Sequence, residues 1–368
     1  MRKSYKRKNC LFCRCIAIVT ALVLTIGCRQ QGVGQQQGAT LSALEKTIAA
    51  ADSPVSALPV VQDEVSKIFH TNPPSGKSDI DGDRENKGSQ TPQQTNDTAA
   101  KTAENPQNLA NYTWQPAYSP ANSLQNRIEP PKGYGREGVA AGSFAEWLRG
   151  FPLKSGFPSV KLYNGQLKSN QSAQYAVLDI DAGEGDLQQC ADAVMRLRAE
   201  YLYAAKRYDA ICFNYTNGFK AAYSQWQKGK RPLIKGNATT WEAKIIPDNT
   251  YKSFKKYLNN VFTYAGTYSL SKELRPVASI EDIKPGDVFI KGGFPGHAVI
   301  VMDVAIHAQT REKVFLLAQS YMPAQDIHLL QNPNDATLSP WYDTHFGQTL
   351  RTPEWSFAKN TLARFANP

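Results

Sequence analysis

The sequence has 368 residues, of which 41% are apolar and 20% are charged, with 25 Gly and 22 Pro. This composition is typical of a globular chain and excludes a polytopic membrane protein, a collagen and a fully disordered chain. The net charge is +10, but residues 1–27 contain six Lys and Arg and no acid, which leaves +4 for the rest. With acids and bases interspersed, that remainder does not indicate nucleic acid as a partner.

Residues 1–27 have the pattern of a bacterial export signal. The basic stretch 2–8 precedes an apolar run over 16–24, which is too short to span a bilayer of about 30 Å. Gly27-Cys28 then resembles the lipobox of bacterial lipoproteins, although Thr25 stands where that motif usually has Leu. The resemblance implies acylation of Cys28 and a lipid anchor in the outer membrane of the cell envelope. A plain signal peptide and an uncleaved anchor are the alternatives.

Residues 28–111 are dominated by Gln, Asn, Thr, Ser, Gly and Pro, and predict a flexible tether. Asp79, Asp81 and Asp83 have the spacing that opens a calcium loop, but Gln90 stands where such a loop needs a bidentate Glu. We therefore expect no calcium site there. Apolar and aromatic residues become frequent from about position 112, which predicts one globular α+β domain over 112–368.

The domain begins with helical patterns and ends with strands. Among the helices, the strongest pattern has Asp186 as its N-cap and runs to about Arg207, with apolar residues on one face. Shorter helices are predicted at 143–148, 218–227 and 251–262, and strands at 159–163, 175–180, 288–290, 297–304 and 313–319. Helices followed by antiparallel-looking strands favour α+β over an alternating parallel sheet.

The six cysteines leave few candidates for chemistry. Cys10, Cys13 and Cys15 lie in the leader, so only Cys190 and Cys212 remain in the domain. Without Cys-x-x-Cys spacing they do not indicate zinc, and we expect no metal or organic cofactor. Three interpretations of Cys190 stay open: a nucleophile near the start of the long helix, a buried core residue, or a structural disulfide with Cys212.

One block of the sequence is similar to known cysteine hydrolases. Pro285-Gly286-Asp287-Val288-Phe289, a Gly-rich loop and then Gly296-His297-Ala298-Val299-Ile300-Val301 resemble the C-terminal half of the NlpC/P60 and CHAP peptidases and amidases. The resemblance implies a papain-like fold, enlarged by insertions around 210–280 and 304–313. It also implies Cys190 as nucleophile, His297 as general base and Gln319 as the residue that orients the imidazole.

The third catalytic position has alternatives. Asp303 and Ser320 could replace Gln319, and His328 near Asp326 is a further candidate for a second base or a supporting residue. His70, His307 and His345 have weaker claims, because they fall in the tether, at a hairpin tip and in an irregular stretch. Several aromatic residues outside periodic core patterns could line a cleft, although core packing is their commoner fate: Trp226, Trp241, Trp341, Tyr342 and Trp355.

The stretch from about Arg127 to Pro323 also resembles an uncharacterised family of Bacteroidetes lipoproteins that is known only as a domain of unknown function. That similarity implies an envelope location and no activity. Together the patterns predict an envelope-anchored cysteine hydrolase that cleaves an amide bond, with peptidoglycan peptide as the expected substrate. The competing hypothesis is a non-catalytic envelope lipoprotein that binds glycan or a protein on a hydrolase-like fold.

Overall fold

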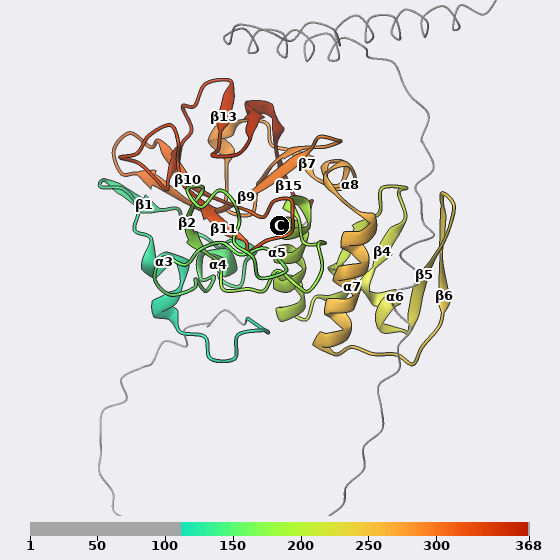
Figure 1. Ribbon diagram of the computed structural model, residues 1–368. Helices are drawn as coiled ribbons and strands as arrows, with labels where there is room; N and C mark the ends of the chain where they lie inside the picture. Colours follow the sequence, from blue (N-terminus) through green and yellow to red (C-terminus); the bar gives the residue numbers. More distant parts are fainter. Residues whose placement is uncertain (1–111, 367–368) are drawn as a thin grey trace, which may run out of the picture. The chain divides into compact units, whose positions relative to one another are not determined.

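The computed structural model describes residues 112–366 (Figure 1). The predicted signal peptide, the acylation site Cys28 and the tether over 28–111 lie outside the described residues. Within the described part, no helix is long and apolar enough to cross a membrane.

An antiparallel sheet of nine strands forms the centre of the domain, which confirms the α+β class. Its main path runs in the order β2-β11-β10-β9-β8-β15-β7, while β1 pairs with β9 and β12 pairs with β10. The strands are β1 (Tyr134–Arg136), β2 (Gln174–Val177), β7 (Arg275–Pro276), β8 (Val288–Lys291), β9 (His297–His307), β10 (Lys313–Gln319), β11 (His328–Leu330), β12 (Tyr342–Asp343) and β15 (Leu362–Arg364).

The central strand β9 separates two hydrophobic cores because its side chains alternate between the faces of the sheet. Ala298, Ile300 and Met302 belong to the larger core, which includes the apolar side of α5 (Cys190–Ala204). Val299 and Val301 face a smaller core, which is closed by the hairpin of β13 (Thr349–Arg351) and β14 (Ser356–Ala358). The sheet is therefore covered by helix on one face and by a small β-hairpin on the other.

Short helices complete the domain. Ser143 caps α4 (Phe144–Arg149) by accepting a hydrogen bond from the Glu146 amide at 3.2 Å. Thr250 caps α7 (Tyr251–Tyr264) in the same way through the Ser253 amide. The remaining α-helices are α3 (Leu124–Arg127), α6 (Tyr223–Gln227) and α8 (Thr267–Glu273). Side-chain caps of this kind satisfy amides that a helix start leaves without partners.

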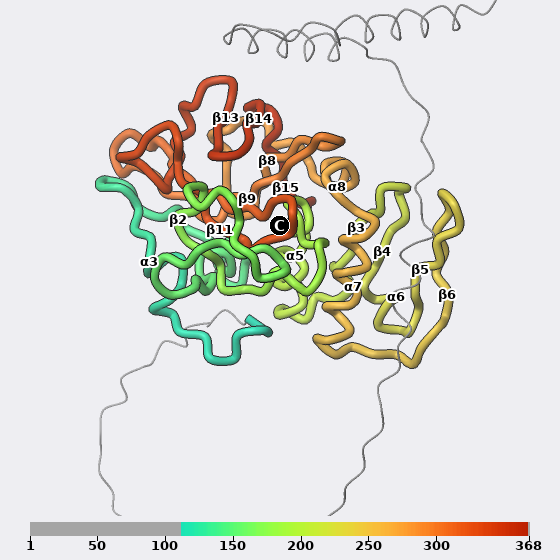
Figure 2. The backbone as a smooth tube through the Cα atoms, in the orientation of Figure 1, coloured from blue at the N-terminus to red at the C-terminus, as the bar shows by residue number. Residues whose placement is uncertain are grey.

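A segment between α5 and α7, here called the insertion, lies outside the nine-stranded sheet. It consists of the hairpin β3 (Cys212–Asn214) and β4 (Lys220–Ala222), helix α6, and the hairpin β5 (Lys230–Lys235) and β6 (Ala238–Ala243). The tube in Figure 2 shows the chain leaving the end of α5 for these hairpins and returning along α7.

The structure corrects three local predictions. The stretch 159–163 forms only isolated bridges, because Lys161 pairs with Leu167 and Leu162 with Gln325. The helix predicted over 218–227 is a strand up to Ala222 and a helix only afterwards. The long helix begins at Cys190, since the Asp186 carboxylate accepts hydrogen bonds from the Ala324 amide and the Gln189 side chain instead of capping the helix.

Candidate functional site

Cys190 is the first helical residue of α5, where the unpaired amides of a helix start concentrate positive potential. Two tight turns precede it, and the Asp192 carboxylate accepts a hydrogen bond from the Gln189 amide at 3.0 Å. The sequence pattern placed Cys190 about one turn inside the helix. The observed position is the one that a helix offers to a nucleophilic thiol.

Three backbone amides surround the thiol of Cys190. They belong to Ala191, Ala298 and Cys190 itself, and their hydrogen bonds favour the thiolate. Ala298 is the second residue of β9 and directly follows His297. The start of α5 and the start of β9 therefore meet at the sulfur, although 107 positions separate Cys190 from His297. The Cys190 residue keeps 9% of its surface exposed.

His297 and Gln319 are in direct contact, as the resemblance predicted. The Nε2 atom of His297 lies 2.8 Å from Oε1 of Gln319, and both residues are 1% exposed. The Gln319 Nε2 atom in turn donates to Oε2 of Glu354 at 2.7 Å. The other Glu354 oxygen accepts a hydrogen bond from Lys168 Nζ, also at 2.7 Å.

This series of hydrogen bonds determines which nitrogen of the His297 imidazole carries the proton. A carboxylate can only accept, so Glu354 holds the NH₂ group of Gln319 toward itself and the Gln319 oxygen toward His297. Nε2 of His297 must then carry the proton, which leaves Nδ1 with the lone pair that a general base needs. His328 supports the same amide orientation, since its Nε2 atom lies 3.5 Å from Gln319 Nε2 and its Nδ1 atom lies 3.0 Å from the Asp326 carbonyl.

Aromatic rings enclose the imidazole of His297. The ring centroids of Tyr321, Trp355 and Phe357 lie 4.8, 5.2 and 5.8 Å from that of His297. Burial raises the pKa of the Tyr321 hydroxyl, and the nearby charges of Glu354 and then Cys190 add to that rise, which places Tyr321 beside the same group of residues. Of the aromatic residues predicted to line a cleft, only Trp355 contacts His297. Trp226 and Trp341 belong to the larger core, Tyr342 to the smaller core, and Trp241 packs on Phe219.

Burial dominates the electrostatics of both Cys190 and His297. It raises the pKa of the Cys190 thiol to about 11, and the nearby Asp192 adds to that rise. It lowers the pKa of His297 to about 4, against the opposing effects of the Gln319 hydrogen bond and the Glu354 charge. The resting pair at neutral pH is accordingly a thiol and a neutral imidazole.

The alternatives to Gln319 do not reach His297. Asp303 lies six positions further along β9, where Arg136 and Arg149 hold its carboxylate at 2.7 Å each. The Ser320 hydroxyl lies between the Gln188 and Gln325 carbonyl oxygens, at 2.9 and 3.0 Å, and donates its one proton to either of them. Cys190 and Cys212 are both free thiols, so the structure has no disulfide between them.

Sequence reasoning missed Glu354 and Lys168. Lys168 is buried and Glu354 is half-buried, and Glu354 joins the site from the β13–β14 hairpin, 35 positions after Gln319. A charged residue beside Trp355 in an irregular stretch gives no periodic signal. Only the three-dimensional pairing of Lys168 with Glu354 distinguishes them from surface charges.

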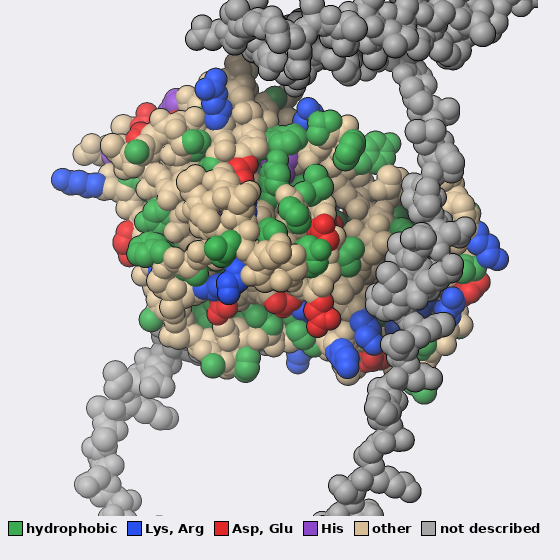
Figure 3. All heavy atoms as spheres, in the orientation of Figure 1, with side chains coloured by type: hydrophobic (Ala, Val, Ile, Leu, Met, Phe, Trp, Pro, Cys, Tyr) green, Lys and Arg blue, Asp and Glu red, His purple; other side chains and the backbone are tan. Residues whose placement is uncertain are grey.

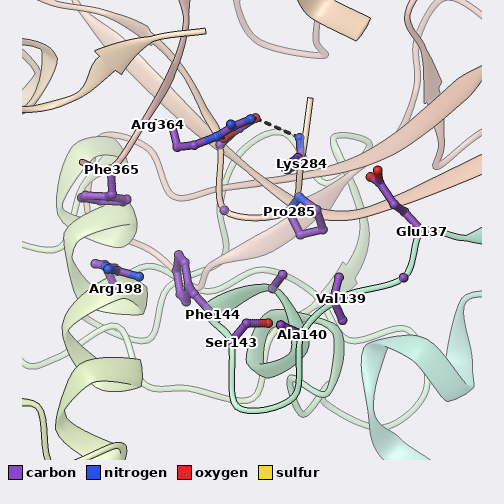
Figure 4. Close-up of a pocket in the computed structure, with 14 residues that line it drawn as sticks. Glu137, Val139, Ala140, Ser143, Phe144, Arg198, Lys284, Pro285, Arg364 and Phe365 are labelled. Atoms are coloured by element: carbon purple, nitrogen blue, oxygen red, sulfur yellow. Dashed lines mark hydrogen bonds and ion pairs between the residues drawn. The ribbon is translucent and has the colours of Figure 1, made fainter. Parts of the chain in front are cut away.

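A second feature lies away from Cys190. A cavity of about 290 Å³ is lined by side chains that include Phe144, Arg198, Lys284 and Phe365 (Figure 4), and by none of the residues Cys190, His297 and Gln319. The Arg198 guanidinium lies over the Phe144 and Phe365 rings, at 5.0 and 5.3 Å. Across residues 112–366, no three His, Cys, Asp or Glu side chains group as metal ligands.

Comparison with protein families gives one match. Residues 124–364 match the family described as Domain of unknown function (4846), and the chain belongs to that family. No curated protein and no solved structure matches the chain. The family covers α3 to β15, and so includes every residue of the Cys190 site.

Proposed function

We propose that this protein is a cysteine hydrolase that cleaves an amide bond. The observation that carries the proposal is the meeting of two elements: Cys190 starts a helix, and its sulfur is hydrogen bonded by the amide that follows His297. A thiol at a helix start, an imidazole with a fixed tautomer and a polar orienting residue are the parts that nucleophilic cysteine chemistry needs. The packing of α5 on an antiparallel sheet supports a papain-like fold.

The reaction has two steps. The Cys190 sulfur attacks the carbonyl carbon while its proton passes to Nδ1 of His297, and the amides of Cys190 and Ala298, which adjoin the sulfur, serve as donors for the oxyanion. Collapse of the tetrahedral intermediate breaks the C–N bond, and the amine leaves with the proton from His297. Water then attacks the thioester, gives its proton to His297, and releases the carboxylic acid and the thiol.

In this scheme Gln319 and Glu354 are positioning residues. Gln319 accepts the Nε2 proton of His297 and keeps Nδ1 available, while Glu354 and Lys168 keep the Gln319 amide from flipping. The neutral resting pair means that His297 acts as a general base during the attack. A preformed thiolate is not required.

The substrate is expected to combine an amide with an apolar group. Phe294 lies in the loop before His297 and is 96% exposed, and Met322 follows Tyr321 and is 54% exposed. These two side chains flank the site in sequence and are available to a ligand. With acylation at Cys28 the domain would face the cell wall, so peptidoglycan stem peptide is the substrate that we propose.

The test uses alkylation first and hydrolysis second. In the chain from residue 28, iodoacetamide should modify Cys190 at pH 7.5 at least about tenfold more slowly after His297→Ala, because general-base assistance is lost. Cys212, the other free thiol of the described domain, is the internal control and should not change. Stem peptides should then release a new amine with the wild type and none with Cys190→Ala. Equal Cys190 rates with and without His297 would refute the proposed pair.

A non-catalytic envelope lipoprotein that binds glycan or a protein is the second candidate. The high pKa of Cys190 and the 1% exposure of His297 favour it, since both make the resting site unreactive. The two candidates differ in one measurement: a binding protein keeps its affinity for peptidoglycan fragments after Cys190→Ala, and neither the wild type nor the variant releases an amine.

A further inference from the structure

The segment from the end of α5 into the first turns of α7 has a strong excess of positive charge. Residues 206–256 contain eleven Lys and Arg and only three Asp and Glu. Because the chain after residue 27 carries +4 in total, the rest of it is net negative. In Figure 3, Lys and Arg side chains gather toward the lower right, over α7 and the β5–β6 hairpin.

Two backbone segments of the insertion are joined side by side. The amides of Lys244 and Ile245 both donate to the Gly229 carbonyl, at 3.1 and 3.2 Å. A side chain at Gly229 would place its Cβ 2.0 Å from the Ile245 oxygen, and Gly229 has a φ of +80°. Only glycine permits this contact, so Gly229 joins residues 228–230 closely to 244–246, and these two segments are here called the basic tip.

The basic tip combines exposed isoleucines with lysines. Ile246 is 86% exposed and Ile245 is 53% exposed, which is unusual for side chains of this size. Lys228 and Lys244 are exposed beside them, and Lys230 is half-buried. Two acids lie nearby: Glu242 is 4.0 Å from Lys244, and Asp248 accepts a hydrogen bond from the Thr250 amide.

Helix α7 extends the positive surface. Lys252 and Lys256 are exposed and one turn apart, so they lie on the same side of the helix. The helix is held against the insertion by a hydrogen bond of 3.2 Å from Trp226 Nε1 to the Ser253 hydroxyl, next to Lys252. Lys255 faces another way and pairs with Asp181 at 2.6 Å.

We propose that the basic tip docks the domain on an anionic lipid bilayer. Lysines alone could bind any polyanion. A soluble polyanion offers no apolar environment for the two exposed isoleucines. At a bilayer surface, lysines lie among anionic headgroups while apolar side chains enter the interface. Glycine-restricted backbone holds Ile245 and Ile246 outward at a fixed position, so little conformational entropy is lost on insertion. Docking at the tip does not depend on hydrolysis at Cys190.

The experiment measures partitioning onto vesicles. The chain from residue 28, carrying Cys28→Ser so that no acyl chain contributes, is sedimented with vesicles of phosphatidylcholine alone or of phosphatidylcholine mixed with anionic phosphatidylglycerol. We expect binding to the anionic vesicles only, and its loss in high salt. Lys228→Glu with Lys244→Glu should weaken it more than about 25-fold, at about fivefold or more per lysine.

Matched variants separate the explanations. Lys132→Glu with Lys161→Glu makes the same charge change at exposed lysines outside the insertion and should leave most of the binding. Ile245→Ser with Ile246→Ser keeps every charge and should still reduce vesicle binding more than about tenfold. Unchanged binding in the Ile245 and Ile246 variant would overturn the proposal in favour of a soluble polyanion. Equal binding to neutral vesicles would overturn the electrostatic part.

Discussion

The start of β9 at His297, here called its uncharged end, and its second half at Asp303, here called its charged end, both bury polar side chains, but they neutralise them differently. At the charged end, the Asp303 carboxylate is fully buried and is held by Arg136 and Arg149. At the uncharged end, His297 is equally buried but neutral, and hydrogen bonds alone link it to Gln319. The ion pairs at Asp303 stabilise the fold by linking β9 to Arg136 and Arg149. At the uncharged end the neutral imidazole keeps a nitrogen lone pair, which an imidazolium in a salt bridge would not have, and the proposed hydrolysis needs that lone pair.

The largest effect should follow from breaking the charged end. Asp303→Asn removes the buried counter-charge of Arg136 and Arg149 and leaves Arg136 only its longer contact with exposed Glu129, and removing one partner of a buried ion pair costs about 3–5 kcal/mol. We expect the free energy of unfolding in urea to fall by about that amount. The folded fraction should still alkylate Cys190 at the wild-type rate, because Asp303 does not contact the Cys190 site. Wild-type stability in this variant would contradict the structural role.

The free energy of unfolding measured over a pH series should show the stability that is lost by burying uncharged histidines. Burial lowers the pKa of His297 and of His328 to about 4 each, from 6.5 in the unfolded chain. Between those values the unfolded state binds more protons, so each histidine removes stability as the pH falls from 6.5 to 4. For His328 the loss is about 3 kcal/mol over that window.

His328→Asn isolates that contribution. The difference between its free energies of unfolding at pH 7 and pH 4.5 should be smaller than the wild-type difference by about 2–3 kcal/mol. Buried acids act in the opposite direction: burial raises the pKa of Glu273 to about 7, and they are present in both proteins, so the comparison cancels them. Parallel pH curves for the two proteins would show that His328 titrates normally in the folded state.

The sequence predicts where β9 and the next strand lie, but it does not predict the role of Asp303. Its apolar run and the following Lys313–Gln319 strand have clear boundaries, and the structure confirms both strands. The role of Asp303 could not be predicted, because its arginine partners lie more than 150 positions away and pair only in the folded chain. The start of α5 was misplaced because Asp186 has the residue type of an N-cap, while its carboxylate is committed to a contact with Ala324.

In the Cys190 site too, residues on predicted strands could be predicted from the sequence and residues in irregular segments could not. His297 and Gln319 stand at the ends of neighbouring strands, so strand order together with the family resemblance predicts their contact. Glu354 and Lys168 come from irregular segments that no pattern connects to the sheet. The two residues pair because a buried lysine needs a carboxylate as its partner. That need leaves no repeating pattern in the sequence that would identify the pair.

Glu354→Gln is the smallest change and the sharpest test of how the uncharged end works. Without the carboxylate, the Gln319 amide can turn and present NH₂ to His297, which moves the imidazole proton to Nδ1 and removes the base. We expect hydrolysis, or His297-dependent alkylation of Cys190, to fall about tenfold, a difference of about 1.4 kcal/mol. Nitrogen-15 chemical shifts of the His297 ring should report the change from an Nε2–H to a mixed or Nδ1–H tautomer.

A purely structural role for Glu354 would give a different result. The carboxylate raises the pKa of His297, so its loss should lower that pKa below about 4 and move the acid limb of the pH–rate profile to lower pH. Lost stability alone would reduce the rate at every pH and leave the limb and the ring shifts in place. Lys168→Met with Glu354→Gln removes the buried cation that the single variant leaves unpaired. If that double variant recovers stability but not the Nε2–H tautomer, Glu354 acts through Gln319 on His297.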